Sequence, residues 1–196
     1  MSGKKHFWNG LSSATALFLL ISISRDFYLP WQRVIFANSD FESGTLENWM
    51  PTGRAFGQQP VFGDNPTARG RGGAWPKGSF WVGTFEDRRA ESMPAGKFQG
   101  DEPQGRLTSV EFTIEEGRII FLLGAGTNSA ETGVALEVNG SRVLFQSGAG
   151  VVRETERMAS IVWDVSSWLG QRARIVVVDE SSGGWGHINV DEFRYG

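Results

Sequence analysis

The sequence predicts an all-β sandwich preceded by a single N-terminal transmembrane helix. Its 196 residues include 26 glycines, 14 phenylalanines and 8 tryptophans, and the apolar runs after residue 37 are short and cut by Gly, Asn and Pro. This composition favours strands over helices. By contrast, residues 7–24 form one long uncharged run. The chain therefore divides into a membrane-directed segment, residues 1–36, and a β-sandwich domain, residues 37–196.

The uncharged run is long enough for a membrane anchor. It follows Lys4 and Lys5, and about 18 helical residues would span roughly 27 Å, the thickness of a bilayer core. Basic residues before the run favour a cytoplasmic N-terminus. We therefore expect a single-pass protein of a bacterial inner membrane, with its C-terminal domain in the periplasm or outside the cell. The alternative is a signal peptide cleaved after small residues such as Ser22 and Ser24, and both interpretations export the domain.

Short strands separated by turns are predicted throughout the domain. Residues 110–114 alternate between apolar and polar side chains, which indicates a half-buried strand, whereas residues 119–123 are apolar on both faces and indicate a central one. Asn139-Gly140 predicts a tight hairpin turn. Before a last strand that ends at Phe193, the predicted strands are residues 46–49, 79–83, 110–114, 119–123, 134–138, 143–145, 161–163 and 174–178.

Two long segments lack any strand period and are predicted to be loops. Residues 52–78 are rich in Gly and Pro, and residues 88–103 form a second irregular segment. Loops of this length in compact domains often carry function. Residues 164–170 predict a capped single turn between two strands.

Several motifs occur in order along the domain and carry a family resemblance. They are Asp40-Phe41-Glu42-Ser43-Gly44, Gly105 to Ser109, Phe121 to Gly126, Trp163-Asp164-Val165-Ser166, and Val178 to Asp191. Together they resemble a galactose-binding-like jelly-roll module, of the kind that accompanies levanase-type fructan hydrolases. The resemblance covers residues 38–196, and the chain is too short to hold the hydrolase domain as well. It therefore implies a jelly-roll fold and a glycan-binding or docking role, not hydrolysis.

The resemblance also implies a structural calcium ion between the first and last strands. Asp40, Glu42 and Asp191 lie at the matching positions. Calcium takes six to eight hard oxygen ligands, which a few carboxylates and backbone carbonyls can supply. The alternative is that Glu42 and Asp191 accept backbone hydrogen bonds at strand ends.

The segment before the last strand offers a candidate ligand site. Trp185 could stack on a ligand, and His187 and Asn189 share one strand parity with it. The alternative role for His187 is structural, bonded to the backbone of a glycine-rich loop. Other residues expected at the same end of the sandwich are Trp81, Arg88 and Asp179.

Sequence features typical of enzymes and of nucleic-acid-binding proteins are missing. His187 is the only histidine after residue 6, there is no Gly-x-Ser-x-Gly motif and no phosphate-binding loop motif, so we expect no catalysis. The formal net charge is −3, and residues 1–36 carry more basic than acidic side chains, so the domain itself is acidic. That charge argues against a nucleic-acid partner. The absence of cysteine excludes disulfides and thiolate chemistry.

Two functions remain open at this point. In the first, the protein is a non-catalytic accessory or scaffold subunit of a larger membrane complex, such as a respiratory or photosynthetic one. Small residues in the helix, among them Ala14 and Ala16, would pack against neighbouring helices within the bilayer. In the second, the domain is a carbohydrate-binding module for a fructan or another cell-surface glycan.

Overall fold

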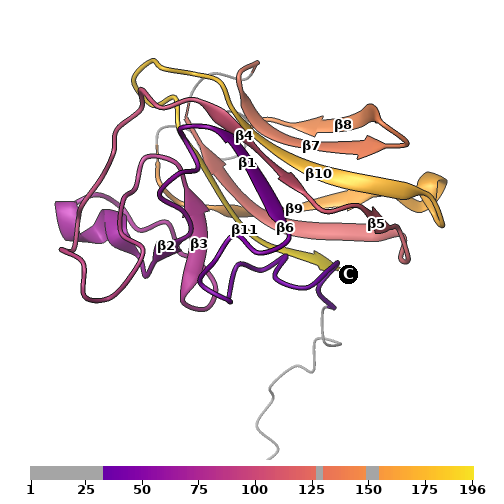
Figure 1. Cartoon of the computed structure of the whole chain (residues 1–196), viewed down its shortest axis with the longest axis horizontal. Helices are drawn as coiled ribbons and strands as arrows, with labels where there is room; N and C mark the ends of the chain where they lie inside the picture. Colours follow the sequence, from indigo (N-terminus) through magenta and orange to yellow (C-terminus); the bar gives the residue numbers. More distant parts are fainter. Residues whose placement is uncertain (1–32, 127–129, 149–154) are drawn as a thin grey trace, which may run out of the picture. The chain divides into compact units, whose positions relative to one another are not determined.

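Two antiparallel sheets pack face to face in the computed structural model, which describes residues 33–126, 130–148 and 155–196 (Figure 1). The elements run in the order β1 (Trp49–Gly53), β2 (Val61–Phe62), η1 (Asn65–Arg69), β3 (Phe80–Gly83), β4 (Gly105–Ser109), β5 (Phe112–Thr113), β6 (Arg118–Ala125), β7 (Thr132–Val138), β8 (Ser141–Gln146), β9 (Ala159–Asp164), η3 (Ser166–Trp168), β10 (Arg172–Asp179) and β11 (Ile188–Tyr195). The predicted all-β sandwich is confirmed.

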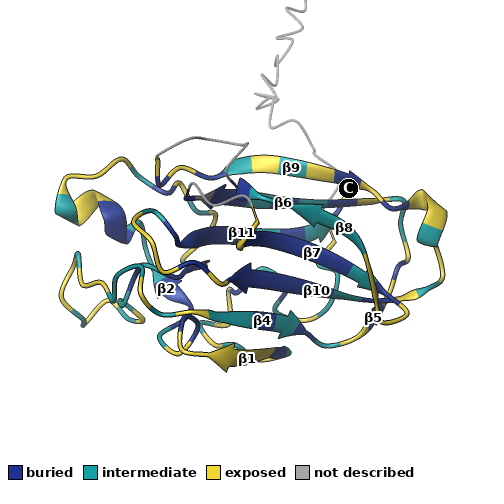
Figure 2. Ribbon diagram, turned by 90° about the horizontal axis from the view of Figure 1, so that it is seen from above, coloured by how far each residue is buried: buried dark blue, intermediate teal, exposed yellow. Residues whose placement is uncertain are grey.

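Each sheet combines strands that are far apart in the sequence. One sheet has the order β1-β4-β10-β7-β8, with β5 paired to β10, and the other has the order β2-β3-β11-β6-β9. Strands β7, β10 and β11 are buried, whereas β1 and β9 lie at the edges and are largely exposed (Figure 2). Asn139 and Gly140 have φ values of 50° and 79°, so the predicted tight turn joins β7 to β8.

Aromatic rings from both sheets form the centre of the core. Phe193 of β11 is fully buried; its ring centroid lies 5.0 Å from that of Phe121 on β6 and 5.6 Å from that of Trp49 on β1. Phe41 stacks on Trp49 at 5.1 Å. The pairing of β11 with β6 is irregular between Asp191 and Arg194, where Glu192 has a φ of 58°. This irregularity shifts the alternation of the strand, so that Phe193 faces the same core as Val190.

The beginning of the domain differs from the sequence-based expectation. Residues 37–48 form consecutive turns instead of strands. Asn38 and Phe41 have positive φ values of 65° and 61°, and the Asn38 side chain donates to the carbonyls of Thr45 and Glu47. This local hydrogen bonding competes with strand pairing. Val34 already pairs with Arg194, so the folded chain includes residues before position 37.

The two predicted loops contain more order than their composition suggested. The segment 52–78 includes β2 and η1. In the segment 88–103, Phe98 forms a bridge with Glu86, whose carboxylate makes a buried ion pair with Arg69 at 2.5 Å. Within the described residues no helix is long and apolar enough to cross a membrane. The helix predicted for residues 7–24 lies outside the described residues.

The aromatic core makes a direct prediction for stability. We expect Phe193→Ala to lower the free energy of unfolding by about 3–5 kcal/mol, because it removes a fully buried ring and leaves a cavity. Val162→Ala is the matched control, since Val162 is 56% exposed on β9, and should change stability by less than about 0.5 kcal/mol. Urea denaturation measures both. Equal effects of the two substitutions would contradict this account of the core.

Candidate functional site

A buried histidine joins three segments at one end of the sandwich, where β6 and β10 end and β7 and β11 begin. We call this the loop end. Nδ1 of His187 lies 2.7 Å from Oδ1 of Asp101, and Nε2 lies 3.2 Å from Oε2 of Glu156. Asp101 belongs to the long loop before β4, Glu156 precedes β9, and His187 precedes β11. The His187 side chain is 1% exposed.

The protonation states of this cluster follow from its geometry. Burial opposes the charge on His187, but the hydrogen bonds to both carboxylates outweigh it and raise its pKa to about 9. Burial also opposes the charge on Glu156, yet hydrogen bonds from His187, Arg71 and Asn189 lower its pKa to about 2. The pKa of Asp101 is lowered as well, because the bond to His187 outweighs its burial. At neutral pH the cluster therefore holds an imidazolium between two carboxylates.

Arg71 balances the second negative charge of the cluster and belongs to a strip of stacked planar groups. Its Nη1 lies 2.6 Å from Oε1 of Glu156. Its guanidinium lies 4.9 Å from the ring centroid of Trp185 and 5.1 Å from that of Phe85. Phe85 stacks on Phe98 at 5.1 Å, with 12° between the ring planes. The strip therefore runs from half-buried Trp185 to Phe98, which is 55% exposed.

Glycines explain how the loop before β11 reaches this position. A Cβ on Gly126 would lie 1.1 Å from the carbonyl oxygen of Trp185, so only glycine allows this approach. The amide of Gly126 donates to the carbonyl of His187, and the amide of Gly186 donates to that of Gly183. The motifs at residues 121–126 and 183–187 thus form two sides of one backbone contact.

Two buried oxygen atoms at the loop end lack a hydrogen-bond partner among the described residues: Oδ1 of Asn189 and Oδ1 of Asp179. The Nδ2 group of Asn189 donates to the carbonyl and the carboxylate of Glu156. Burial raises the pKa of Asp179 to about 7.

The structure gathers some predicted site residues and separates others. Trp185, His187 and Asn189 lie together at the loop end, each in contact with the His187 cluster. Trp81 is fully buried, and its Nε1 donates to the carbonyl of Gly63 at 2.8 Å, so it has no face open to a ligand. Arg88 lies apart from the cluster and donates to the carbonyls of Phe62, Glu91 and Met93.

The residues predicted to bind calcium lie beside the middle and the C-terminal half of β11. Glu42 accepts hydrogen bonds from the backbone amides of Ser79 and Phe80, and Asp191 accepts them from Lys77 and Glu192. Asp40 pairs with Arg194 at 3.1 Å. Among the described residues, no three His, Asp or Glu side chains are grouped to hold a metal.

One feature of these carboxylates still favours a cation. Burial raises the pKa of Asp191 to about 9, and the charges of Glu192 and Glu42 add to this effect. A bound cation would relieve that repulsion, so calcium binding stays a prediction.

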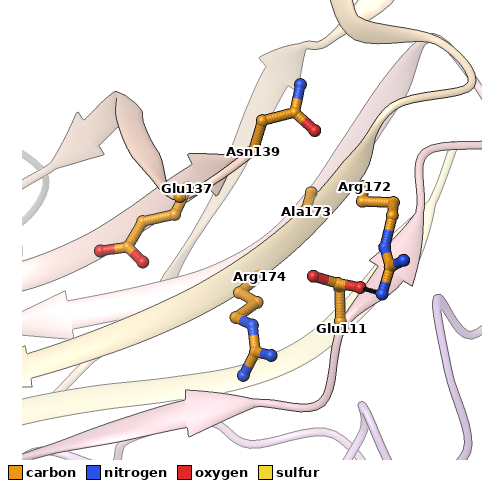
Figure 3. A pocket seen from close by; sticks show the side chains of 7 residues that line it. Glu111, Glu137, Asn139, Arg172, Ala173 and Arg174 are labelled. Atoms are coloured by element: carbon orange, nitrogen blue, oxygen red, sulfur yellow. Dashed lines mark ion pairs between the residues drawn. The ribbon is translucent and has the colours of Figure 1, made fainter.

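A separate hollow lies at the opposite end of β7 and β10 (Figure 3). It measures about 140 Å³. Arg172 forms an ion pair with Glu111, and Arg174 faces Glu137 across the two strands. Its lining has no aromatic ring, and Glu111 and Arg172 already pair with each other. The loop end is therefore the better candidate site.

Sequence reasoning missed Asp101, Glu156 and Arg71. Each lies in an irregular segment, and its partners are 31 to 86 positions away. No local pattern marks such residues. The one available signal was the isolated histidine, because a buried imidazole requires partners.

Comparisons with known proteins point to carbohydrate-related relatives at a distance. No family model matches the chain. Part of the chain is 43% identical over 96 residues to ecdE of Aspergillus rugulosus, which is provisionally named a glycosyl hydrolase. The match covers 49% of this chain and 13% of that protein.

Similar solved structures include binding modules and an adhesin domain. TmCBM61 in complex with β-1,4-galactotriose has 18% identity and a TM-score of 0.48, with 83% of this chain and 97% of that chain covered. A family 35 carbohydrate-binding module from Clostridium thermocellum has 17% identity and a TM-score of 0.34, with 76% of this chain and 91% of that chain covered. The K3 adhesin domain of Lys-gingipain from Porphyromonas gingivalis W83 has 15% identity and a TM-score of 0.42, with 79% of this chain and 93% of that chain covered. Sequence identities and TM-scores this low give no information about a ligand of this chain. The resemblance to levanase-associated modules is not confirmed.

The His187 cluster predicts a loss of stability at alkaline pH. Because the pKa of His187 rises from 6.5 to about 9 on folding, its stabilisation is complete below pH 6.5 and is lost as the pH rises through about 9. Between about pH 6 and about pH 10, we expect the wild type to lose on the order of 3 kcal/mol more stability than His187→Gln. Asp179 and Asp191 titrate in this range in both proteins, so the difference between the two profiles reports His187 together with its charge effect on Asp179. Parallel pH profiles in urea denaturation would contradict the charged cluster.

Calcium binding predicts a thermal shift that depends on Asp191. Added calcium should raise the melting temperature of the wild type, because a ligand that binds the native state alone stabilises it. Asp191→Asn removes the carboxylate that would ionise to bind the cation and should abolish the shift. An unchanged wild-type melting temperature with calcium and with chelator would exclude the site.

Proposed function

We propose that the domain is a non-catalytic carbohydrate-binding module of jelly-roll topology, which recognises a glycan at its loop end. The observation that carries this proposal is the strip of planar groups from Trp185 through Arg71 and Phe85 to Phe98. A sugar ring has faces of C–H groups that pack on aromatic rings, and hydroxyls at its edge that bind planar polar side chains. Concave or flat sites with this combination of apolar surface and a few polar groups are typical of small-ligand binding.

The charged cluster supports binding because it fixes the strip in advance. His187, Asp101, Glu156 and Arg71 carry two positive and two negative charges, each with an opposite charge within 3.2 Å. The buried carboxylate of Glu156 holds the guanidinium of Arg71, while 38% of the Arg71 side chain stays exposed. Ordering side chains before the ligand arrives reduces the entropy lost on binding.

The same geometry argues for binding in preference to catalysis. Both ring nitrogens of His187 already contact carboxylates, so the imidazole has no lone pair free to accept a proton from a nucleophile or a water molecule. Catalytic acid–base work at this histidine would require the cluster to break.

The relative from Aspergillus rugulosus is consistent with a module role. The matched 96 residues form 13% of that protein, so the similarity concerns one portion of a much larger chain. A module attached to glycan-degrading enzymes, as in the resemblance to levanase-associated domains, suggests a fructan or another cell-surface glycan as ligand. The competing function, an accessory subunit of a membrane complex, depends on residues 7–24, which lie outside the described residues.

The proposal predicts that glycan affinity depends on the strip. On a glycan array, the wild type should bind at least one neutral or acidic glycan. Trp185→Ala should weaken that binding by roughly thirtyfold, because a central aromatic contact is commonly worth about 2 kcal/mol. Titration calorimetry with the selected oligosaccharide measures the loss.

Leu169→Ala provides the matched control for Trp185→Ala. Leu169 is an apolar residue, 50% exposed next to η3, at the far end of the domain from the strip. Its substitution should leave affinity unchanged. Failure of the wild type to bind any glycan on the array would refute the proposed function.

A further inference from the structure

An exposed tryptophan, Trp75, lies near the loop-end cluster. Trp75 is 59% exposed, and its backbone φ is 58°, a conformation that bulky residues rarely adopt. The guanidinium of Arg157 lies 4.2 Å from its ring centroid. Arg157 directly follows Glu156, the carboxylate that holds His187 and Arg71. The Trp75–Arg157 pair is therefore connected to the same buried cluster.

The backbone around Trp75 is held on both sides. The amide of Ala74 donates to Oδ1 of Asp64 at 2.8 Å, and the carbonyl of Ala74 accepts a hydrogen bond from Met158 at 3.0 Å. Two residues later, the amide of Lys77 donates to Asp191 at 2.8 Å. An unfavourable backbone conformation persists only where the surrounding structure imposes it, and such residues concentrate at binding sites. The fold thus presents a large apolar ring to solvent in a fixed orientation.

Arg157 differs from the other arginines stacked on rings at this end. Arg69 is paired with Glu86, and Arg71 with Glu156. Within the described residues, Arg157 is exposed and has no carboxylate partner. Its guanidinium keeps its hydrogen-bond donors available while the stacked ring restricts its position.

We propose that Trp75 and Arg157 form a subsite for a sugar that carries an anionic group, either the carboxylate of a uronic acid or a sulfate ester. This inference rests on the proposed glycan-binding function and specifies its ligand class. The exposed face of Trp75 packs on the sugar ring, and Arg157 donates to the anion in the bidentate geometry that guanidinium favours. A hollow of about 190 Å³ over β6 is lined by Lys77, Leu122, Ser160 and Glu192 among others, and Lys77 lies two residues after Trp75.

The test compares matched acidic and neutral glycans. Oligogalacturonate is acidic, whereas its methyl ester and a β-1,4-galactan oligosaccharide are neutral, and all three share the galacto ring. A sulfated galactan is the second acidic probe and distinguishes sulfate from carboxylate. We expect the wild type to bind one of the two acidic probes at least tenfold more tightly than the neutral ones. Arg157→Gln should remove this preference, and Trp75→Ala should weaken binding of every probe.

Arg142→Gln is the matched control, since Arg142 also stacks on a ring, that of Phe145 on β8, at 5.1 Å. It should bind all probes as the wild type does. Equal affinity for acidic and neutral probes, or an unchanged preference in Arg157→Gln, would overturn the subsite and leave the proposed function intact. Absence of binding to all four probes and to a general glycan array would overturn both.

Discussion

The imidazolium of His187, bonded to Asp101 and Glu156, is the interaction on which the loop end depends. It connects segments separated by 86 and 31 positions in the sequence, none of which belongs to a sheet at the point of contact. A charge with 1% of its side chain exposed is tolerated only because two carboxylates compensate its desolvation. Removing His187 leaves Asp101 without its charged partner and Glu156 with Arg71 alone, so the imidazolium is the group that joins the three segments.

The aromatic surface follows from this cluster. Glu156 positions Arg71, Arg71 separates Trp185 from Phe85, and the residue after Glu156 stacks on Trp75. Apolar patches rimmed by polar residues on a protein surface often mark interaction sites. Here the aromatic rings are fixed by buried charges and by glycines that allow the backbone to approach closely. A rigid surface of this kind suits a ligand that is itself rigid and flat-faced, as a sugar ring is.

The apolar patterns of residues 119–123, 134–138 and 174–178 were sufficient to predict the central strands β6, β7 and β10, and Asn139-Gly140 sets its own turn. Strands β2 and β4 were not predicted, because their short segments show no clear period. The gathering of Trp185, His187 and Asn189 followed from their proximity in the chain. Trp81 could not be placed, because its burial depends on residues 71–78 covering the outer face of β3 and β11, a contact between distant segments. The same reason hid Asp101 and Glu156: isolated acidic residues in loops carry no pattern, and only the folded chain brings them to His187.

Nuclear magnetic resonance of the tryptophan indole groups tests the central claim most directly. The glycan with the highest affinity would be titrated into ¹⁵N-labelled protein, with indole signals assigned by single Trp→Phe substitutions. The account predicts that the indole signals of Trp185 and Trp75 shift on binding, while that of Trp163, which lies in the core, does not move. Glycan binding that leaves both Trp185 and Trp75 unchanged and shifts signals elsewhere would contradict a site at the loop end.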